Sequence, residues 1–421
     1  MLWKLIHNQS RATTMASIES IQTLMSKEDC EKILRRSLDS PAHLLSFKIT
    51  KFDDNVAGFL GDHLTLTIRF ATNNTKSQTT YFLKTLPQFN NNQLDYVLEA
   101  GIFKKEVVLY QNLLSELLKI GHFGPRCFFV KDNVIVLENM NAKGFKMNPK
   151  VLYMTEDHCV AMLKTVAKYH ASTLIYEHKR GLRLDEKFKY EIRETCFSFV
   201  EGQPRYKWLV SATKCATDLI RLMSLKKHDV DAVCESFHRF IFEEMEQIIS
   251  PSRRFRNVLS HDDLWCNNLL FNDHNECVLV DFQLVRYTPP CMDFLTSLYL
   301  NLDCNYVENN IGAFADVYYS CLVEELKKHG LNSSELPKEE FLESLNWYRL
   351  PALVETVMYG THIFISEALS NQIVADVAMY NEFSFINRSK FAVKEFRDNP
   401  QYRDRISAIL TLLVETLANR L

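Results

Sequence analysis

Apolar and polar residues alternate with a period of two in the first third of the chain. Leucine, isoleucine or phenylalanine occupies every second position from 64 to 70, with histidine, threonine or arginine between them. This alternation predicts a half-buried β-strand. Similar runs predict strands at 47–52, 79–86, 127–130 and 134–137, with a polar hairpin loop at 71–78. A helix capped by Ser26 is predicted at 26–38, so this region is expected to form a small antiparallel sheet accompanied by a helix.

At 101–114 the apolar residues recur at the 3.6-residue spacing of a helix, which predicts a helix there. The same spacing predicts helices over most of the chain beyond Gly144. In the helix predicted at 157–175, His170 shares a face with apolar residues and is interpreted as a core histidine. Further helices are predicted within 185–250, at 294–300 with Asp293 as N-cap, before Gly330, and at about 338–348, 350–370 and 402–420. The low counts of 11 glycines and 11 prolines also favour a helix-rich chain.

Composition and charge exclude several classes of protein. The 421 residues suffice for two domains or one bilobal enzyme. A formal net charge of −3 gives no electrostatic basis for nucleic-acid binding. No uncharged apolar run is long enough to predict a membrane span; the nearest, 352–369, contains Glu355 and Glu367. The 11 cysteines form no CxxC pair, which indicates reduced thiols in a cytoplasmic protein.

Residues 1–20 are predicted to be a disordered tail. No acidic residue precedes Glu19, and Lys4 and Arg11 give this stretch a faint likeness to a transit peptide. Its apolar part is too short for a secretory signal, however, and no small-residue cleavage site follows it. Met15 offers an alternative start.

The strongest chemical signal lies at 259–283, where two apolar segments each lead to carboxylates. The first delivers Asp263, with Asn268 five residues later, and the second delivers Asp281. Phosphoryl transfer requires a base and a magnesium site, and Mg²⁺ prefers a few protein oxygens with retained water. Asp263 is therefore the candidate base, and Asn268 and Asp281 are the candidate metal ligands. His261 is expected to hold this loop through backbone hydrogen bonds. The alternative, that His-Asp-Asp is an ordinary polar turn, does not account for the joint pattern.

A lysine and a glutamate in the first third of the chain fit the same chemistry. Lys84 lies near the end of a predicted strand, and Glu106 lies in the helix predicted at 101–114. An ion pair between them would hold the lysine toward a phosphate. Taken alone, Lys84 is better interpreted as a lysine at a strand end with its amine in water.

Two further segments are candidates for nucleotide binding. The turn Gly58-Phe59-Leu60-Gly61 precedes a strand, so its backbone N–H groups are placed to cover phosphates, although two glycines in a hairpin usually mark only a hairpin. Glu138, Asn139 and Met140 end the last predicted strand where the sheet region gives way to helices. Their backbone groups are predicted to bind the edge of an adenine.

Taken together, these motifs resemble the insect ecdysteroid-kinase-like (CHK-kinase-like) family, which is related to choline kinases and aminoglycoside phosphotransferases. The matching pieces occur in family order over about 47–300. They are Phe82-Leu-Lys-Thr-Leu-Pro87, Phe103-Lys-Lys-Glu-Val-Val-Leu-Tyr110, Val136-Leu-Glu138 with Gly144-Phe145, Ala167-Lys-Tyr-His-Ala171, His261-Asp-Asp-Leu-Trp-Cys-Asn-Asn268, and Asp281-Phe-Gln283 with Asp293.

The resemblance implies an α+β, protein-kinase-like bilobal fold. A small antiparallel-sheet N-lobe is expected at 21–140 and a large, mainly helical C-lobe at 141–421. It also implies a monomeric small-molecule kinase that uses ATP and Mg²⁺ to phosphorylate a hydroxyl of a steroid-like or xenobiotic alcohol, with a role in detoxification. In this family's pattern Lys84 contacts the α- and β-phosphates and pairs with Glu106. Gln283 replaces the glycine of protein kinases, which points away from protein substrates.

Two positions depart from the family pattern. Asp262 stands where the family usually has glycine. Its carboxylate either raises the pKa of Asp263 by like-charge repulsion or points outward with little effect. The segment Leu137-Glu-Asn-Met also differs from the family's commoner Glu-Asp-Leu. This departure weakens the assignment of the adenine contacts to Glu138, Asn139 and Met140.

Two other functions stay open on the sequence. One is a non-catalytic, pseudokinase-like binder of an apolar ligand or a protein partner, for which Asp262 is the only positive sign. The other is a choline- or sugar-type kinase, which would need an acidic or polar acceptor pocket. The aromatic-rich segment 190–260 favours an apolar acceptor instead.

Overall fold

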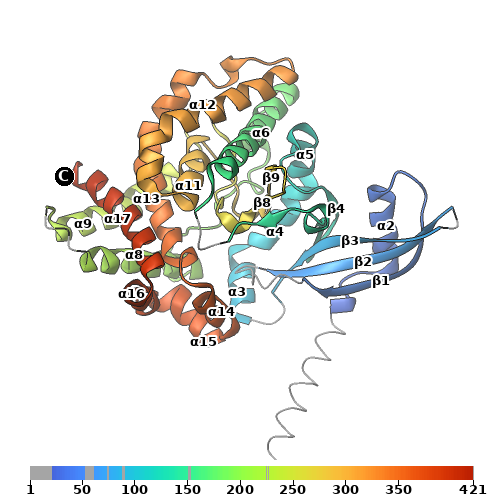
Figure 1. Cartoon of the computed structure of the whole chain (residues 1–421), viewed down its shortest axis with the longest axis horizontal. Helices are drawn as coiled ribbons and strands as arrows, with labels where there is room; N and C mark the ends of the chain where they lie inside the picture. The colour runs from blue at the N-terminus through green and yellow to red at the C-terminus, as the bar shows by residue number, and fades with distance from the viewer. Residues whose placement is uncertain are drawn as a thin grey trace, which may run out of the picture.

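The computed structural model consists of two unequal parts, a sheet lobe and a larger helical lobe (Figure 1). It describes residues 21–52, 61–73, 75–87, 91–149, 153–223, 225 and 227–420. The tail predicted at 1–20 therefore lies outside the described residues.

The smaller part is built on a five-stranded antiparallel sheet. Its strands are β1 (His43–Lys51), β2 (Asp62–Thr72), β3 (Thr75–Thr85), β4 (Cys127–Lys131) and β5 (Val134–Glu138). They lie in the order β1-β2-β3-β5-β4, and each neighbouring pair runs antiparallel. The predicted fold class, with a small antiparallel sheet followed by a mainly helical part, is confirmed.

The hairpin between β2 and β3 is tighter than the predicted loop at 71–78. Pairing continues outward to Thr72 and Thr75. The polar residues at the start of β3 are exposed, and they form strand because threonine tolerates a two-sided polar strand well. The absence of apolar residues there made the sequence look like a loop.

Helix α2 (Lys27–Ser37) packs against β1 and β4 (Figure 1). Ser26 and Asp29 form the capping box at its start, as the predicted N-cap requires. An ion pair between Lys131 and Asp29, 2.9 Å long, and a hydrogen bond from Arg36 to the carbonyl of Phe128, 3.0 Å long, tie the helix to β4.

A run of helices follows β3 and separates it from β4. It comprises α3 (Asn91–Ala100), α4 (Ile102–Leu109), the π-helical turn η1 (Tyr110–Leu114) and α5 (Ser115–Gly121). Gly101, with φ of +64°, adopts the left-handed conformation between α3 and α4. The helix predicted at 101–114 is therefore present and extends beyond its predicted end, and α4 carries Glu106 between the two lobes.

The larger part is mainly helical, with short strands near the sheet lobe. Its helices are η2 (Asn141–Lys143), α6 (Glu156–Arg180), α7 (Leu184–Lys187), α8 (Pro204–Leu222), α9 (Val230–Arg239), η3 (Phe240–Glu244), α10 (Met245–Ile248), η4 (Cys266–Asn268), η5 (Phe282–Leu284), α11 (Cys291–Asn301), α12 (Cys304–Lys328), η6 (Ser333–Glu335), α13 (Lys338–Ile363), α14 (Glu367–Ala375), α15 (Val377–Asn381), η7 (Glu382–Ile386), α16 (Ser389–Asp398) and α17 (Pro400–Ala418). Its strands are β6 (Lys146–Met147), β7 (Val258–Ser260), β8 (Leu269–Phe271), β9 (Cys277–Leu279) and β10 (Arg286–Thr288).

Two predictions in this part are wrong. Helices predicted at 338–348 and 350–370 form one helix, α13, which contains Pro351 and ends at Ile363. Pro351 and the residues after it are buried, so packing offsets the backbone hydrogen bond that proline cannot make. Asp293 is not the N-cap of α11, because the helix begins at Cys291 and the Asp293 side chain is fully buried.

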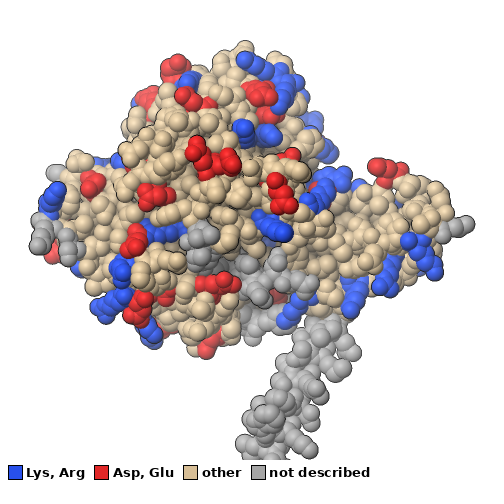
Figure 2. Space-filling model, viewed as in Figure 1, with Lys and Arg blue, Asp and Glu red and all other residues tan. Residues whose placement is uncertain are grey.

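The apolar character of the described helices and the state of the cysteines bear on two further expectations. No described helix combines the length and apolar character that a membrane crossing needs. All 11 cysteines are free thiols, and most are buried. On the face shown in Figure 2, acidic and basic side chains are interspersed over the helical lobe.

Candidate active site

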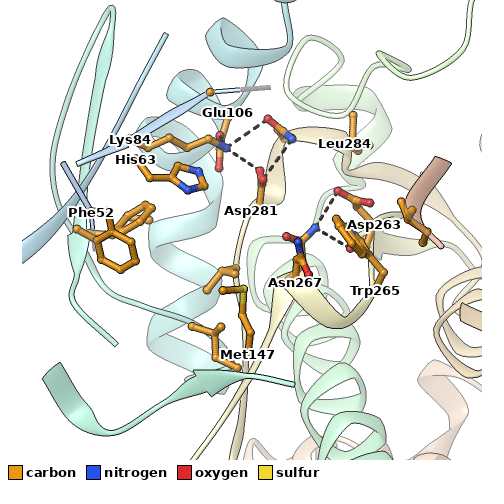
Figure 3. Close-up of a pocket in the computed structure, with 18 of the residues that line it drawn as sticks. Phe52, His63, Lys84, Glu106, Met147, Asp263, Trp265, Asn267, Asp281 and Leu284 are labelled. Carbon is orange, nitrogen blue, oxygen red and sulfur yellow. Dashed lines mark hydrogen bonds and ion pairs between the residues drawn. The ribbon is translucent and has the colours of Figure 1, made fainter. Parts of the chain in front are cut away.

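A continuous cavity runs between the sheet lobe and the helical lobe. Side chains from β2, β3 and α4 approach it from one side, and those of the 263–284 segment approach it from the other (Figure 3). The cavity brings together Lys84, Glu106, Asp263, Asn268 and Asp281. These are the five residues that the sequence singled out for phosphate, metal and base chemistry, so one space contains all of them.

Lys84 stands at the centre of the charged part of this cavity. Its Nζ donates to Glu106 Oε2 and to Asp281 Oδ1, both at 2.6 Å. Burial opposes the charged lysine, but Asp281 and then Glu106 raise the pKa of Lys84 above its ordinary value. The predicted ion pair with Glu106 is therefore present, and Lys84 is a fixed positive charge that joins the two lobes.

Gln283 is a third partner of Lys84 that the sequence reading did not assign. Its Oε1 accepts from Lys84 Nζ at 3.3 Å, and its Nε2 donates to Asp281 Oδ2 at 3.3 Å. The side chain therefore bridges the lysine and the carboxylate. The only sequence signal was a glutamine in the place of a glycine, which does not predict this contact.

The Asp293 carboxylate holds the loop that carries Asp263 through hydrogen bonds to its backbone. The Asp293 carboxylate accepts from the backbone N–H groups of His261, at 2.6 Å, and Asp262, at 2.9 Å. His170 Nε2 lies 3.0 Å from the same carboxylate. Because this carboxylate fixes two consecutive amides just before Asp263, Asp293 positions the loop. His170 is a buried histidine, as predicted, but it belongs to this polar network and not to an apolar core alone.

His261 joins the loop to β9. Its Nε2 lies 3.0 Å from the backbone carbonyl of Val280, and its ring packs against Phe282 with centroids 4.8 Å apart. Burial lowers the pKa of His261 and thereby favours the neutral ring. These contacts agree with the prediction that this histidine holds the loop through hydrogen bonds to the backbone.

Asp263 and Asn268 are linked directly. Asn268 Nδ2 donates to the side chain and to the backbone carbonyl of Asp263, both at 2.8 Å. Since both bonds use the amide nitrogen, the amide oxygen of Asn268 is left for another partner. The backbone carbonyl of Asn268 also accepts from Val280 N at 3.1 Å, so the pairing of β8 with β9 brings Asn268 beside Asp281.

The oxygens of Asn268 and Asp281 fit the predicted magnesium site. Mg²⁺ takes hard oxygen ligands and keeps several waters, so one carboxamide and one carboxylate beside bound phosphates are enough. Asp281 is held at φ of +68°, a conformation uncommon outside glycine that occurs at functional sites. Among the described residues no cluster of three or more His, Cys, Asp and Glu side chains forms a metal site, so a closed all-protein cage is not indicated there.

Asp263 is expected to titrate near neutral pH in the protein without nucleotide and metal. Burial, followed by the charge of Asp281, raises its pKa to about 8. The folded protein then retains this proton up to about pH 8, whereas the unfolded chain releases it near the ordinary value of 3.8. The folded state binds more protons in this window, so this contribution to stability decreases as the pH rises from about 4 to about 8.

The Asp263→Asn variant lacks that titration. We expect its unfolding free energy, relative to the natural protein, to increase steadily between pH 5 and pH 8. Urea unfolding of both proteins at pH 5, 6.5 and 8, without nucleotide or divalent ions, measures this difference. A difference that stays constant across the range would show that the carboxyl does not have a raised pKa.

Apolar side chains from both lobes line the part of the cavity where the adenine is predicted to bind. Apolar side chains of the sheet lobe, including Phe82 and Leu137, face Met147 and Leu270 of the helical lobe. Glu138, Asn139 and Met140 line the same end. The Glu138 carboxylate is engaged by Lys143 at 2.5 Å, and Asn139 Nδ2 donates to Thr80 Oγ1 at 3.0 Å, so these side chains anchor the connection between the lobes.

Of the turn that is predicted to cover phosphates, the structure describes only Gly61. Gly61 lines the cavity, and a Cβ there would lie 3.1 Å from the carbonyl of Thr85 and 3.5 Å from Lys84 Cε. A side chain at this position would therefore crowd β3 next to Lys84. Gly58 and Phe59, the other two predicted phosphate-binding residues, lie outside the described residues.

The other end of the cavity, beyond Asp263, is lined mainly by aromatic side chains. They are Tyr96, Trp208, Trp265, Tyr359, Tyr380, Phe383 and Phe385, with Cys196, His362, Ile363 and Ser384 between them. Most come from α13, α15 and η7 and not from the 190–260 segment, which contributes only Cys196 and Trp208. No local sequence pattern indicates this origin, because packing alone brings these helices to the loop.

Asp262 points neither outward nor toward Asp263. Its side chain is buried and forms an ion pair with Arg286. It does not contribute to the raised pKa of Asp263, whose causes are burial and Asp281. Both sequence interpretations of this residue are therefore wrong. Its φ of +62° explains why glycine suits the position.

A sheet lobe whose buried lysine–glutamate pair meets two aspartates and an asparagine of a helical lobe defines a kinase-like protein. A family model described as the ecdysteroid kinase-like family matches residues 55–331. The chain belongs to this family, and its kinase-like class supports a small-molecule phosphotransferase.

Solved structures of low identity match most of the chain. A gentamicin complex of the phosphotransferase APH(2")-IIa is 12% identical, covers 90% of this chain and 98% of its own, and has a TM-score of 0.37. Plasmodium vivax ethanolamine kinase is 14% identical over 82% of this chain and 84% of its own, with a TM-score of 0.37. The choline kinase LicA from Streptococcus pneumoniae is 11% identical over 90% and 97%, with a TM-score of 0.40. The comparison with curated proteins found no match.

Proposed function

We propose that this protein is a cytoplasmic, ATP-dependent kinase that transfers the γ-phosphate to a hydroxyl of a bulky apolar alcohol, such as a steroid or a plant-derived compound. The observation that carries the proposal is one continuous cavity whose lining combines Lys84, Asp281 and Asp263 with apolar residues of both lobes and with a set of aromatic side chains. Family membership supports the reaction type, and the aromatic lining supports the acceptor class. ATP would bind between an N-lobe at 21–140 and a C-lobe at 141–421.

Each polar residue has a task in this proposal. Lys84, held by Glu106, neutralises charge on the α- and β-phosphates. Asp263 orients the acceptor hydroxyl and takes its proton. Asn268 and Asp281 would hold Mg²⁺, which neutralises the charge that develops on the transferred phosphoryl group. The raised pKa of Asp263 brings this carboxyl close to the working pH that suits a general base.

Transfer from γ-³²P-labelled ATP tests the proposal. The protein is incubated with MgCl₂ and, in separate reactions, with ecdysone as a polyhydroxylated steroid, phenolic glycosides, choline and an aminoglycoside. Labelled steroid or phenolic product is expected, with no product from choline and no inhibition by it, because the described lining of the aromatic end holds no carboxylate besides Asp263. Labelled choline would favour the choline-type alternative, and no product from any acceptor would favour the non-catalytic one.

The Phe385→Ala substitution tests the acceptor pocket separately. Phe385 lines the aromatic end, where its ring lies 5.4 Å from that of Tyr96. Loss of a large apolar contact of this kind costs about 1.5–3 kcal/mol, so the KM for the apolar acceptor is expected to rise by about tenfold or more while the KM for ATP is unchanged. Steady-state kinetics with each substrate varied in turn give both constants.

The matched control is Phe242→Ala. Phe242 is also partly buried and packs on Tyr206, with ring centroids 6.0 Å apart, but it does not line the cavity. Both KM values should stay at their natural levels in this variant. A rise in the KM for ATP in Phe385→Ala, or equal effects in the two variants, would contradict the assignment of the aromatic end to the acceptor.

A further inference from the structure

Arg286 is a buried arginine directly beneath the loop that carries Asp263. It begins β10, which pairs antiparallel with β7, and its partner in that register is Ser260. Only 2% of its surface is exposed. Because β7 leads straight into the loop, the guanidinium lies next to the start of the loop. The proposed reaction gives this residue no task.

Three carboxylates from separate parts of the chain surround this guanidinium. Arg286 Nε donates to Asp262 in the loop, and Nη2 donates to Glu355 Oε1 of α13 at 2.5 Å. Nη1 lies 3.3 Å from Glu194 Oε2, in the segment between α7 and α8. Asp262 and Glu355 are almost completely buried. A cluster of this kind is costly to bury and is weak evidence for stability, so conformational specificity is its better explanation.

The backbone at Asp262 supports the same interpretation. Its φ of +62° costs energy for residues with a side chain, although aspartate and asparagine adopt it more readily than most. The side chain nevertheless reaches Arg286, so the ion pair offsets that strain. Observed strain next to a reactive residue is a reason to look for a function. Asp262 is the immediate neighbour of Asp263.

The other two carboxylates belong to segments that form the acceptor pocket. One turn after Glu355, on the same face of α13, Tyr359 lines the aromatic end of the cavity. Two residues after Glu194, Cys196 lines it too, and the Tyr359 hydroxyl lies 3.3 Å from Cys196 Sγ. Glu194 also accepts from the backbone N–H of Phe197 at 2.8 Å, which fixes its own segment. Arg286 therefore connects the loop to two walls of this pocket.

A second buried cation reinforces the connection. Lys105, next to Glu106 on α4, donates to the carbonyl of Arg193 at 2.7 Å and to Thr195 Oγ1 at 3.1 Å. Its Nζ also donates to the carbonyl of Val285, the residue before Arg286. The helix that orients Lys84 is thus tied to the same two segments that meet at Arg286.

We propose that Arg286 is a positioning residue that fixes the acceptor pocket relative to Asp263, through Asp262 on one side and through Glu355 and Glu194 on the other. The inference rests on the proposed kinase reaction and adds residues to it. Arg286 does not line the cavity, so it acts on the reaction only through these neighbours. Small displacements of reacting groups have large effects on rate. A cluster that holds the acceptor pocket in place relative to Asp263 therefore affects kcat.

Removing either buried carboxyl charge tests the proposal. In Asp262→Asn and in Glu355→Gln, kcat for the acceptor is expected to fall by about 10- to 100-fold while the KM for ATP is unchanged. Asparagine tolerates the positive φ at position 262, and Arg286 retains two carboxylates in each variant, so the unfolding midpoint is expected not to fall. Arg286→Lys, which keeps the charge but loses the planar fork, is expected to lower kcat in the same way and gives the answer should one of the other variants fail to fold.

Hydrogen–deuterium exchange provides a readout that needs no acceptor. Glu355→Gln is expected to increase exchange in the distant loop 261–268 as well as in 355–363, because the two segments share Arg286. Glu308→Gln is the matched control. It removes a charge from a pair that also involves α13, with Arg349 at 2.7 Å, and should alter neither kcat nor exchange in the loop.

The outcomes separate the two hypotheses. A natural protein that transfers phosphate to no acceptor would overturn the proposed function, and the positioning task would fall with it. An active natural protein whose Asp262→Asn and Glu355→Gln variants keep the natural kcat would overturn the positioning task alone. The same conclusion would follow if kcat fell only in proportion to the unfolded fraction, or if exchange rose only near position 355.

Discussion

The Asp263→Asn variant is expected to transfer phosphate about 1,000-fold more slowly than the natural protein, since a positioned general base typically contributes about 10²- to 10⁴-fold. Asparagine preserves the shape of the side chain, and an amide there cannot accept the acceptor's proton. Because Asp263 lies apart from Lys84, with Asp281 between them (Figure 3), nucleotide affinity should remain near its natural value. Initial rates at saturating ATP and titration with a fluorescent ATP analogue measure the two quantities.

Asp273→Asn is the control for this variant. Asp273 lies on the exposed turn between β8 and β9, ten positions after Asp263, and the same change of charge there should leave the rate unchanged. An Asp263→Asn variant that keeps more than about a tenth of the natural rate would contradict the assignment of Asp263 as the base.

The Lys84→Met variant is expected to lose both activity and stability. A hydrogen bond to a charged group contributes about 1.5–3 kcal/mol, so kcat/KM for ATP should fall by about tenfold to 150-fold or more. The buried Glu106 and the partly buried Asp281 would also be left as neighbouring carboxylates without their shared cation. Removing one partner of a buried ion pair costs about 3–5 kcal/mol, which chemical denaturation measures directly.

Lys131→Met distinguishes this effect from the loss of any lysine in the sheet lobe. Lys131 forms an ion pair with Asp29, but a third of its side chain is exposed (33%). Partly exposed pairs contribute about 1 kcal/mol or less, so this variant should keep its ATP kinetics and most of its stability. Similar losses in both variants, or natural ATP kinetics in Lys84→Met, would contradict the phosphate-binding assignment of Lys84.

Much of the charged site could be predicted from the sequence because local patterns determine it. Asp263 and Asp281 each follow an apolar strand within a short segment, and Asn268 directly precedes another. The pairing of β8 with β9 then brings Asn268 beside Asp281. Lys84 and Glu106 lie on a strand and on a helix that alternation and helical periodicity identified. The strands of the sheet and the helix-rich second lobe followed from the same periodicities.

The parts that sequence patterns missed depend on tertiary packing. Glu355 and Tyr359 lie on a helix that looked like two helices with a membrane-like apolar core, and no periodicity shows that this helix meets the Asp263 loop. The inward direction of Asp262 depends on Arg286, which is 24 positions away. Asp293 resembles a helix cap in the sequence, yet its carboxylate binds backbone groups of a different segment. Contacts between distant segments leave no local signal.

Single-turnover transfer tests the central claim most directly. The protein, in excess over γ-³²P-labelled ATP and with MgCl₂, is mixed with a pool of hydroxylated steroids and phenolic glycosides, and the products are separated by chromatography and identified by mass. The natural protein is expected to move the label to an alcohol oxygen within the first turnover, and Asp263→Asn is expected not to do so on that timescale. Absence of any labelled alcohol, with the natural protein and Asp263→Asn indistinguishable, would contradict the claim that this cavity is a kinase active site.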